Sequence, residues 1–162
     1  MLFRSHYQLG ETGKLPAEFS ALVLGNGGAA RAAIVGLQAL GCRRISVSGR
    51  NLDSVGVLAK EFKAAVVPLA ALNQHQCDLL IQATSVGMWP ASEASPITPA
   101  QICAATVFDL IYNPQETKLL QMARAKGCAV IQGIEMYLAQ AARQFEYWTG
   151  KKPPLARMRR AA

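Results

Sequence analysis

The chain has 162 residues, 51% of them hydrophobic, and a formal net charge of +7. This length and composition suit one globular domain with its own core, and they exclude a disordered or collagen-like chain. No apolar run approaches the ~20 residues that span a bilayer, and the first residues lack the apolar stretch of a secretory signal. We therefore expect a soluble, cytoplasmic protein with no membrane partner.

The positive charge indicates either a nucleic-acid partner or a ligand that carries phosphate groups. The basic residues are scattered except within 151–160, and no aromatic residues interleave with them. We therefore predict a solvated basic C-terminal tail at 151–162 and no nucleic-acid partner, with DNA binding by this tail kept as a minor alternative. The four cysteines stand far apart and complete no metal-ligand spacing with a histidine, so we predict reduced, mostly buried thiols and no metal site. They are Cys42, Cys77, Cys103 and Cys128.

After a lead-in segment at 1–19, strand and helix patterns alternate through residue 150. Strands are predicted at 20–24, 44–48, 65–69, 78–83, 107–112 and 129–132. Helices are predicted at 28–40, 53–62, 116–126 and 134–148. This alternation predicts an α/β domain over 20–150: a Rossmann-like, three-layer αβα fold around a mainly parallel, six-stranded sheet.

A glycine-rich turn, G-N-G-G-A-A at 25–30, lies between the first predicted strand and the first predicted helix. In that context Gly25 permits a tight turn, Gly27 lets the backbone approach a pyrophosphate, and Ala30 allows close packing of helix on strand. The amide groups at the helix start then face the phosphates. A dinucleotide site is the favoured interpretation, and a glycine turn without a ligand is the alternative.

The end of the second strand indicates which dinucleotide binds. An NAD site usually has an acidic residue there, whereas this chain has S-G-R-N at 48–51. Arg50 can receive the 2′-phosphate of NADP, and a carboxylate would repel it. Asp53 comes later and suits a helix start. We therefore predict NADP rather than NAD.

Five ordered segments resemble the shikimate dehydrogenase family. The glycine turn is similar to its G-A-G-G-A-x-R turn, and 48–51 to its N-R-T motif. The other segments are I-Q-A-T-S-V-G-M at 81–88, D-L-I-Y-N-P-x-E-T at 109–117, and 133–150, which resembles G-x-x-M-L-x-x-Q-A followed by F-x-x-W-T-G.

The resemblance implies roles at matching positions. The glycine turn would bind the pyrophosphate, and the 48–51 motif would bind the 2′-phosphate. The segment after the fourth strand would line the cofactor pocket, and the last predicted helix would lie beside the nicotinamide. The implied cofactor-binding residues are Gly25, Gly27, Gly28, Ala29, Arg50, Asn51, Thr84, Ser85, Val86, Gly133 and Met136. Tyr112 and Gln140 would reach hydroxyl or carboxylate groups of shikimate or 3-dehydroshikimate.

Each of these residues also has a purely structural interpretation. Thr84 and Ser85 can be ordinary turn residues, Met136 a core residue, Tyr112 a packing residue and Gln140 a solvated helix residue. Asp109 we expect to be structural, because a carboxylate in a buried strand usually accepts backbone hydrogen bonds.

The chain also departs from the family pattern. Ser54 stands where a second arginine often binds the 2′-phosphate, and Asn51 replaces a threonine. Gln82 replaces an asparagine, and Tyr137 stands where leucine is common.

In the family, an N-terminal half binds shikimate and supplies a catalytic lysine and aspartate. Its three motifs do not occur here: S-x-S-x-x-x-H-N, N-V-T-x-P-x-K and N-T-D-G. We therefore assign no catalytic residue here. The favoured hypothesis is the cofactor-binding portion of an NADP-dependent shikimate dehydrogenase of aromatic amino-acid biosynthesis, inactive on its own. It would self-associate or pair with a missing N-terminal catalytic domain. The alternative is a non-catalytic module that senses NADP or a shikimate- or quinate-like ligand.

Overall fold

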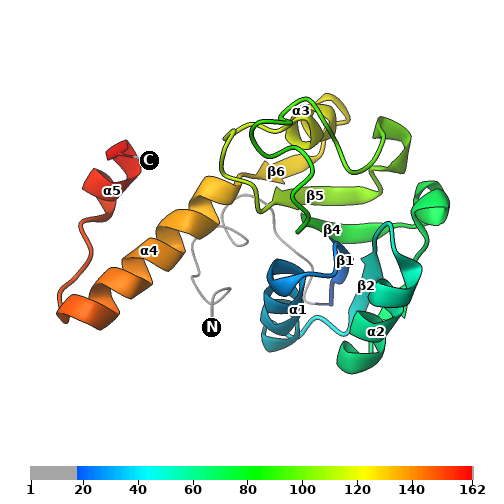
Figure 1. The fold of residues 1–162 in the computed structure, drawn as a ribbon, viewed down its shortest axis with the longest axis horizontal. Coiled ribbons are helices and arrows are strands. Elements are labelled where there is room, and N and C mark those ends of the chain that lie inside the picture. The colour runs from blue at the N-terminus through cyan, green and yellow to red at the C-terminus, as the bar shows by residue number, and fades with distance from the viewer. Residues whose placement is uncertain (1–17, 162) are drawn as a thin grey trace.

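The computed structural model describes residues 18–161, which form a parallel sheet covered on both faces (Figure 1). The six strands are β1 (Ser20–Leu24), β2 (Arg44–Ser48), β3 (Ala65–Val66), β4 (Cys77–Gln82), β5 (Ala104–Asp109) and β6 (Ala129–Ile131). The helices are α1 (Gly28–Ala39), α2 (Leu52–Phe62), α3 (Lys118–Ala125), α4 (Gly133–Thr149) and α5 (Leu155–Ala161). Two short 3-10 helices, η1 (Leu69–Gln74) and η2 (Pro99–Gln101), complete the set.

The strands lie in the order β3-β2-β1-β4-β5-β6, and every neighbouring pair is parallel. The strands β2 and β3 are thus added on one side of β1 and the strands β4 to β6 on the other, which makes the boundary between β1 and β4 a switch point. In doubly wound sheets such a switch point opens a crevice at the carboxyl ends of the strands. The predicted α/β class and six-stranded parallel sheet are confirmed.

The apolar residues of the strands alternate between two cores. On β1, Ala21 and Val23 pack against α1 and α2, whereas Leu22 and Leu24 face η1 and α3. All four side chains are buried. Continuous apolar strands arise because both faces of the sheet are covered, as the sequence pattern indicated.

Two predicted strands differ from the structure by more than one residue at an end. The third ends at Val66 because Pro68 has no N–H for the ladder and η1 begins directly after it. The fifth was predicted at 107–112 and runs from Ala104 to Asp109. Strand pairing stops there because the Asp109 carboxylate accepts the amide of Ile111 and turns the chain. Tyr112 consequently lies in a loop beyond the strand.

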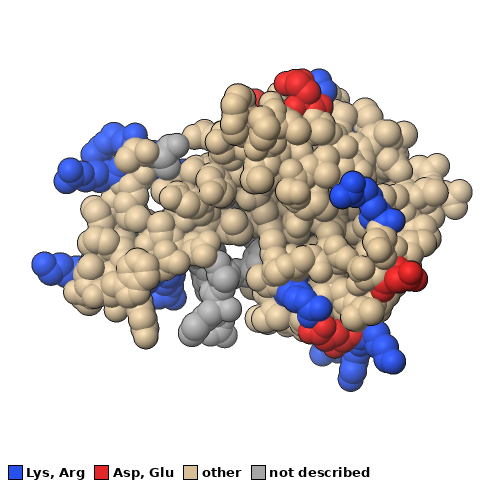
Figure 2. All heavy atoms as spheres, viewed as in Figure 1, with Lys and Arg blue, Asp and Glu red and all other residues tan. Residues whose placement is uncertain are grey.

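The basic segment after residue 150 contains α5, which turns back beside α4 (Figure 1). The Arg159 guanidinium makes a two-pronged ion pair with the Glu135 carboxylate, with the second contact at 2.6 Å. On the face drawn in Figure 2, the lysines and arginines lie in separate groups rather than in one stripe. Within residues 18–161, no helix combines the length and apolar character needed to cross a bilayer.

Candidate functional site

The glycine turn connects β1 to α1 at the carboxyl edge of the sheet. Gly25 has φ +114°, and a Cβ there would lie 2.9 Å from the carbonyl oxygen of Ala83. Its amide donates to the Ser48 carbonyl at 2.8 Å. The turn is thus held between the ends of β2 and β4, and only glycine meets both the conformation and the close approach.

The start of α1 is open to a ligand. Gly27 is the N-cap, no side chain caps the helix, and its first turn has no acidic residue. A Cβ at Gly27 or Gly28 would meet no atom within 4 Å, so packing does not require glycine at either position. The free N–H groups and the helix dipole favour an anion here.

A first cavity of about 340 Å³ lies in front of this turn. Its lining joins the turn to the end of β2 and to the segment after β4. Arg50 is the one charged side chain among the described residues that line it. The lining residues are Leu24, Gly25, Asn26, Gly27, Gly49, Arg50, Asn51, Leu69, Ala83, Thr84, Ser85, Val86 and Pro96.

Asn51 has a structural role in addition to the 2′-phosphate binding that the family resemblance implies. Its Oδ1 accepts the backbone amide of Ser54 at 3.0 Å and so caps α2. The side-chain amide nitrogen of Asn51 keeps its donor capacity, and the exposed guanidinium of Arg50 stands beside it in the sequence. The cavity therefore offers donors and positive charge at two places, the helix start and Arg50. That combination fits a dinucleotide with a 2′-phosphate.

Gln82 shapes the segment that carries Thr84, Ser85 and Val86. Its side chain is fully buried at the end of β4. The side-chain oxygen accepts the Thr84 amide at 2.8 Å, and the side-chain nitrogen donates to the Val86 carbonyl at 2.9 Å. The Thr84 hydroxyl accepts the Val86 amide at 3.1 Å. Gln82 departs from the family pattern, and its role in shaping the 84–86 segment was not predicted. A single amide at the end of an apolar strand was a usable signal.

A second cavity of about 600 Å³ continues from the first. The two share Ala83, Thr84 and Ser85, so these residues form the boundary between them. The second cavity brings together Tyr112, Met136 and Gln140, which stand far apart in the sequence. Its lining residues are Ala29, Ala32, Ala33, Ala83, Thr84, Ser85, Met88, Trp89, Leu110, Ile111, Tyr112, Asn113, Met136 and Gln140.

Two residues with implied cofactor roles, Gly28 and Gly133, line neither of the two cavities, whereas Val86 lines the first. A Cβ at Gly133 would overlap the carbonyl oxygen of Ile111. Close packing of α4 on the segment after β5 therefore explains the glycine at 133, and its contact with a cofactor stays a prediction.

Tyr112, which lines the second cavity, stacks on Tyr137 of α4. The rings of Tyr112 and Tyr137 have centroids 4.8 Å apart and an interplanar angle of 27°. The Trp89 amide donates to the Asn113 carbonyl at 3.1 Å and joins the two loops on this side. Tyr137, a departure from the family pattern, thus contacts the residue expected to meet substrate.

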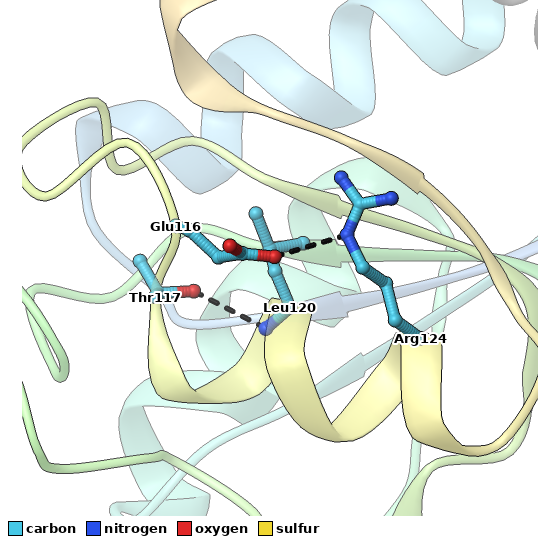
Figure 3. A network of polar contacts seen from close by, with 4 residues as sticks. All are labelled: Glu116, Thr117, Leu120 and Arg124. Carbon is cyan, nitrogen blue, oxygen red and sulfur yellow. Dashed lines mark hydrogen bonds and ion pairs between the residues drawn. The ribbon is translucent and has the colours of Figure 1, made fainter.

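A buried carboxylate fixes the loop that carries Tyr112. Asp109 accepts the Ile111 amide at 3.0 Å and the Thr117 hydroxyl at 2.6 Å. Thr117 in turn accepts the Leu120 amide at the start of α3, and Glu116 pairs with Arg124 on the same helix (Figure 3). Burial raises the pKa of Asp109 to about 6, although both hydrogen bonds oppose the shift. The expected structural role of Asp109 is confirmed.

Family models match most of the chain. The model for shikimate/quinate 5-dehydrogenase matches residues 12–101, and the model for the shikimate 5′-dehydrogenase C-terminal domain matches residues 133–162. The chain belongs to the shikimate/quinate dehydrogenase family. The resemblance inferred from the five segments is confirmed.

Individual relatives cover the chain along most of its length. A shikimate dehydrogenase (NADP(+)) from Maridesulfovibrio salexigens is 45% identical over 134 residues, which are 82% of this chain and 49% of the relative. The chain spans about half the length of the curated relatives it matches.

Two solved structures share the fold. Shikimate 5-dehydrogenase from Thermus thermophilus, solved with NADP(H) and shikimate, has a TM-score of 0.80 at 36% identity, covering 93% of this chain and 58% of that one. Quinate dehydrogenase from Corynebacterium glutamicum, solved with NAD, has a TM-score of 0.79 at 27% identity, covering 90% and 55%.

Proposed function

We propose that residues 20–150 form an NADP-binding domain that serves hydride transfer between NADP and a shikimate-type substrate. The observation that carries this proposal is the pair of adjoining cavities with Thr84 and Ser85 at their boundary. One end has an open helix start and Arg50, and the other has Tyr112 and Gln140. A dinucleotide can lie across this boundary with its phosphates at the first end and its ring at the second.

The roles of the residues follow from their positions. The amides at Gly27, Gly28 and Ala29 would hold the pyrophosphate, and Arg50 and Asn51 the 2′-phosphate. When bound, the nicotinamide supplies or accepts the hydride. Met136 and the aromatic residues of the second cavity, Trp89 and Tyr112, would cover the ring when the dinucleotide is bound.

The substrate would lie against Tyr112 and Gln140. A phenol hydroxyl and a side-chain amide are both able to donate to a carboxylate or pair with ring hydroxyl groups. Shikimate, 3-dehydroshikimate and quinate all carry these groups.

Hydride transfer also requires a proton donor or acceptor. The described residues that line the second cavity include no lysine, aspartate, glutamate or histidine. We propose that a lysine–aspartate pair from polypeptide outside these residues completes the site. The same lining supports a second candidate function, a non-catalytic module that senses NADP or a shikimate-like ligand.

Tryptophan fluorescence tests cofactor binding by the chain. Trp89 lines the second cavity, whereas Trp148 is 75% exposed near the end of α4. Titration with NADPH should quench the emission of a Trp148→Phe variant, which retains Trp89, and should affect a Trp89→Phe variant less. Absence of any NADPH response in the unmodified chain would contradict the dehydrogenase proposal and an NADP-sensing module.

Shikimate oxidation separates the two candidates. The dehydrogenase hypothesis predicts that NADPH forms from NADP and shikimate once a polypeptide carrying the lysine–aspartate pair is added, and that the chain alone gives none. A sensing module predicts NADPH binding with no turnover in either case. Turnover by the chain alone would contradict our assignment of the proton-transfer groups.

A further inference from the structure

Three cysteines lie at the amino edge of the sheet, opposite the two cavities. Cys77 begins β4, Cys103 immediately precedes β5, and Cys128 immediately precedes β6. All three belong to the same apolar layer between the sheet and α3. Because parallel strands start at one edge, residues far apart in the sequence meet there.

Two of these thiols are in direct contact. The Sγ atoms of Cys77 and Cys103 lie 3.9 Å apart. The backbone amide of Cys77 donates to the Cys103 carbonyl at 3.0 Å, and the register pairs Cys77 with Ala104. A strand spacing of ~4.8 Å and an offset of one residue place their Cα atoms roughly 5.8 Å apart. That separation is within the range that disulfides adopt.

Positive charge lies close to the pair. Lys126 Nζ donates to the carbonyl oxygens of Pro99 at 2.9 Å and Ile102 at 3.0 Å, so its ammonium group is fixed next to Cys103. The Cys77 thiol and, to a lesser degree, Lys126 lower the pKa of Cys103 in spite of its burial. A stabilised thiolate is the reactive form of cysteine.

We propose that Cys77 and Cys103 form an intramolecular disulfide when the chain meets hydrogen peroxide. The Cys103 thiolate attacks one peroxide oxygen, an S–O bond forms, the O–O bond breaks, and the departing hydroxide takes a proton to become water. The Cys77 sulfur then attacks the sulfenic sulfur of Cys103. The S–S bond forms as the S–O bond breaks, and the leaving hydroxide takes the Cys77 proton. Two thiols lose two electrons, and one peroxide yields two waters.

Access and proximity favour this pair over the other cysteines. Cys103 is buried and its contact Cys77 is half-buried, so hydrogen peroxide, which is little larger than water, reaches the Cys103 sulfur past Cys77. The sulfur atoms must approach from 3.9 Å to about 2.05 Å, a movement that side-chain rotation and a small strand shift can supply. Cys42 lies in the other apolar layer, where its thiol donates to the Phe19 carbonyl at 3.3 Å. It therefore serves as an internal control.

The test uses the full chain treated with a few equivalents of hydrogen peroxide, then unfolded in guanidinium chloride and alkylated with N-ethylmaleimide so that buried thiols also react. The chain has four cysteines, so the reduced chain takes four adducts. We expect two adducts after oxidation, a linked peptide pair containing Cys77 and Cys103, and return to four adducts after dithiothreitol. Four adducts after peroxide, a link through Cys128, a disulfide between two chains, or sulfinic acid at Cys103 would each contradict the proposal.

Variants identify the two sulfur atoms. Cys77→Ser should abolish the link and leave a sulfenic acid at Cys103 that dimedone traps, whereas Cys42→Ser and Cys128→Ser should form the link at the unmodified rate. Loss of the link in the Cys128→Ser variant would show that Cys128 takes part and would overturn the pairing. Peptide mapping of the unmodified chain decides the matter even if a variant fails to fold.

Discussion

Tyr137 on α4 stacks on Tyr112 in the loop after β5, with ring centroids 4.8 Å apart. The contact joins α4 to the loop that lines the second cavity. Tyr112 is 48% exposed and lines that cavity, whereas Tyr137 is 43% exposed and packs on Tyr112 without lining it. A residue that departs from the family pattern therefore orients one that the pattern expects.

The stack should appear as a coupling energy between the two tyrosines. In a double-mutant cycle of Tyr112→Leu and Tyr137→Leu, we expect the unfolding free energies to couple by about 0.5–1 kcal/mol, the lower part of the range for aromatic pairs because both rings are half-exposed. Urea unfolding measures it. Tyr137→Phe keeps the ring and should change little, and additive effects of the two leucine variants would contradict the contact.

Gln82 should be required for both stability and cofactor binding. Gln82→Leu leaves the Thr84 amide and the Val86 carbonyl without their partner, so we expect a loss of about 2–3 kcal/mol in unfolding free energy. NADPH affinity should fall at least about tenfold because the 84–86 segment loses its shape. Gln82→Asn, which keeps the amide on a shorter chain, should lose less of both. Equal losses in the two variants would show that the amide itself is unimportant.

Alanine substitutions at two glycines of the turn should have different effects, one on stability and the other on NADPH binding. Gly25→Ala should lower the unfolding free energy by about 2 kcal/mol or more, because φ is +114° and a Cβ would press on the Ala83 carbonyl. Gly27→Ala should cost about 0.5 kcal/mol or less, since its Cβ would face open space, yet should weaken NADPH binding at least about tenfold. Thermal unfolding and fluorescence titration measure the two effects. A stable Gly27→Ala variant with unchanged NADPH affinity would argue against phosphates at this turn.

Asp109 should make the chain less stable as pH rises from about 4 to about 6. Its pKa is raised from 3.8 to about 6 in the fold, so the native state holds this proton more tightly than the unfolded chain. The associated stability is fully present below the unfolded pKa and is lost as pH passes through the folded pKa, by up to about 3 kcal/mol. Asp109→Asn does not titrate and should lack this component.

Urea unfolding of both chains at several pH values isolates the contribution of Asp109, because the other carboxylates are common to both. The stability of the unmodified chain minus that of Asp109→Asn should decrease as pH rises across that window. A difference that increases with pH would mean that hydrogen bonds from Ile111 and Thr117 outweigh burial.

Local features of the site were predictable from the sequence. The glycine turn, Arg50 and the 84–86 segment each follow directly after a strand, so their placement at one sheet edge follows from parallel topology. The fifth strand was misplaced because Ala104 and Ala105 give a weak strand pattern while Ile111 and Tyr112 give a strong one. The side chains of Ile111 and Tyr112 line the second cavity, and Ile111 is also buried in the core, so neither residue belongs to the strand ladder.

Relationships between distant residues were not predictable from the same patterns. The stack of Tyr137 on Tyr112 depends on how α4 crosses the segment after β5. The contact of Cys77 with Cys103 depends on the register between β4 and β5, which a single sequence does not specify for strands joined by a long connection. Gln82 was visible as an unusual residue, but its two hydrogen bonds required the turn geometry.

Selection of NADP over NAD by Arg50, at a dinucleotide site built on the glycine turn, is the central proposal. Its most direct test is the ratio of NADPH to NADH affinity in the unmodified chain and in Arg50→Ala, with the exposed Arg43→Ala variant as a matched loss of charge. We predict that the unmodified chain and Arg43→Ala bind NADPH at least about tenfold more tightly than NADH, and that Arg50→Ala loses this preference while NADH affinity stays the same. Equal affinity for the two cofactors in the unmodified chain, or a preference that survives Arg50→Ala, would contradict the account.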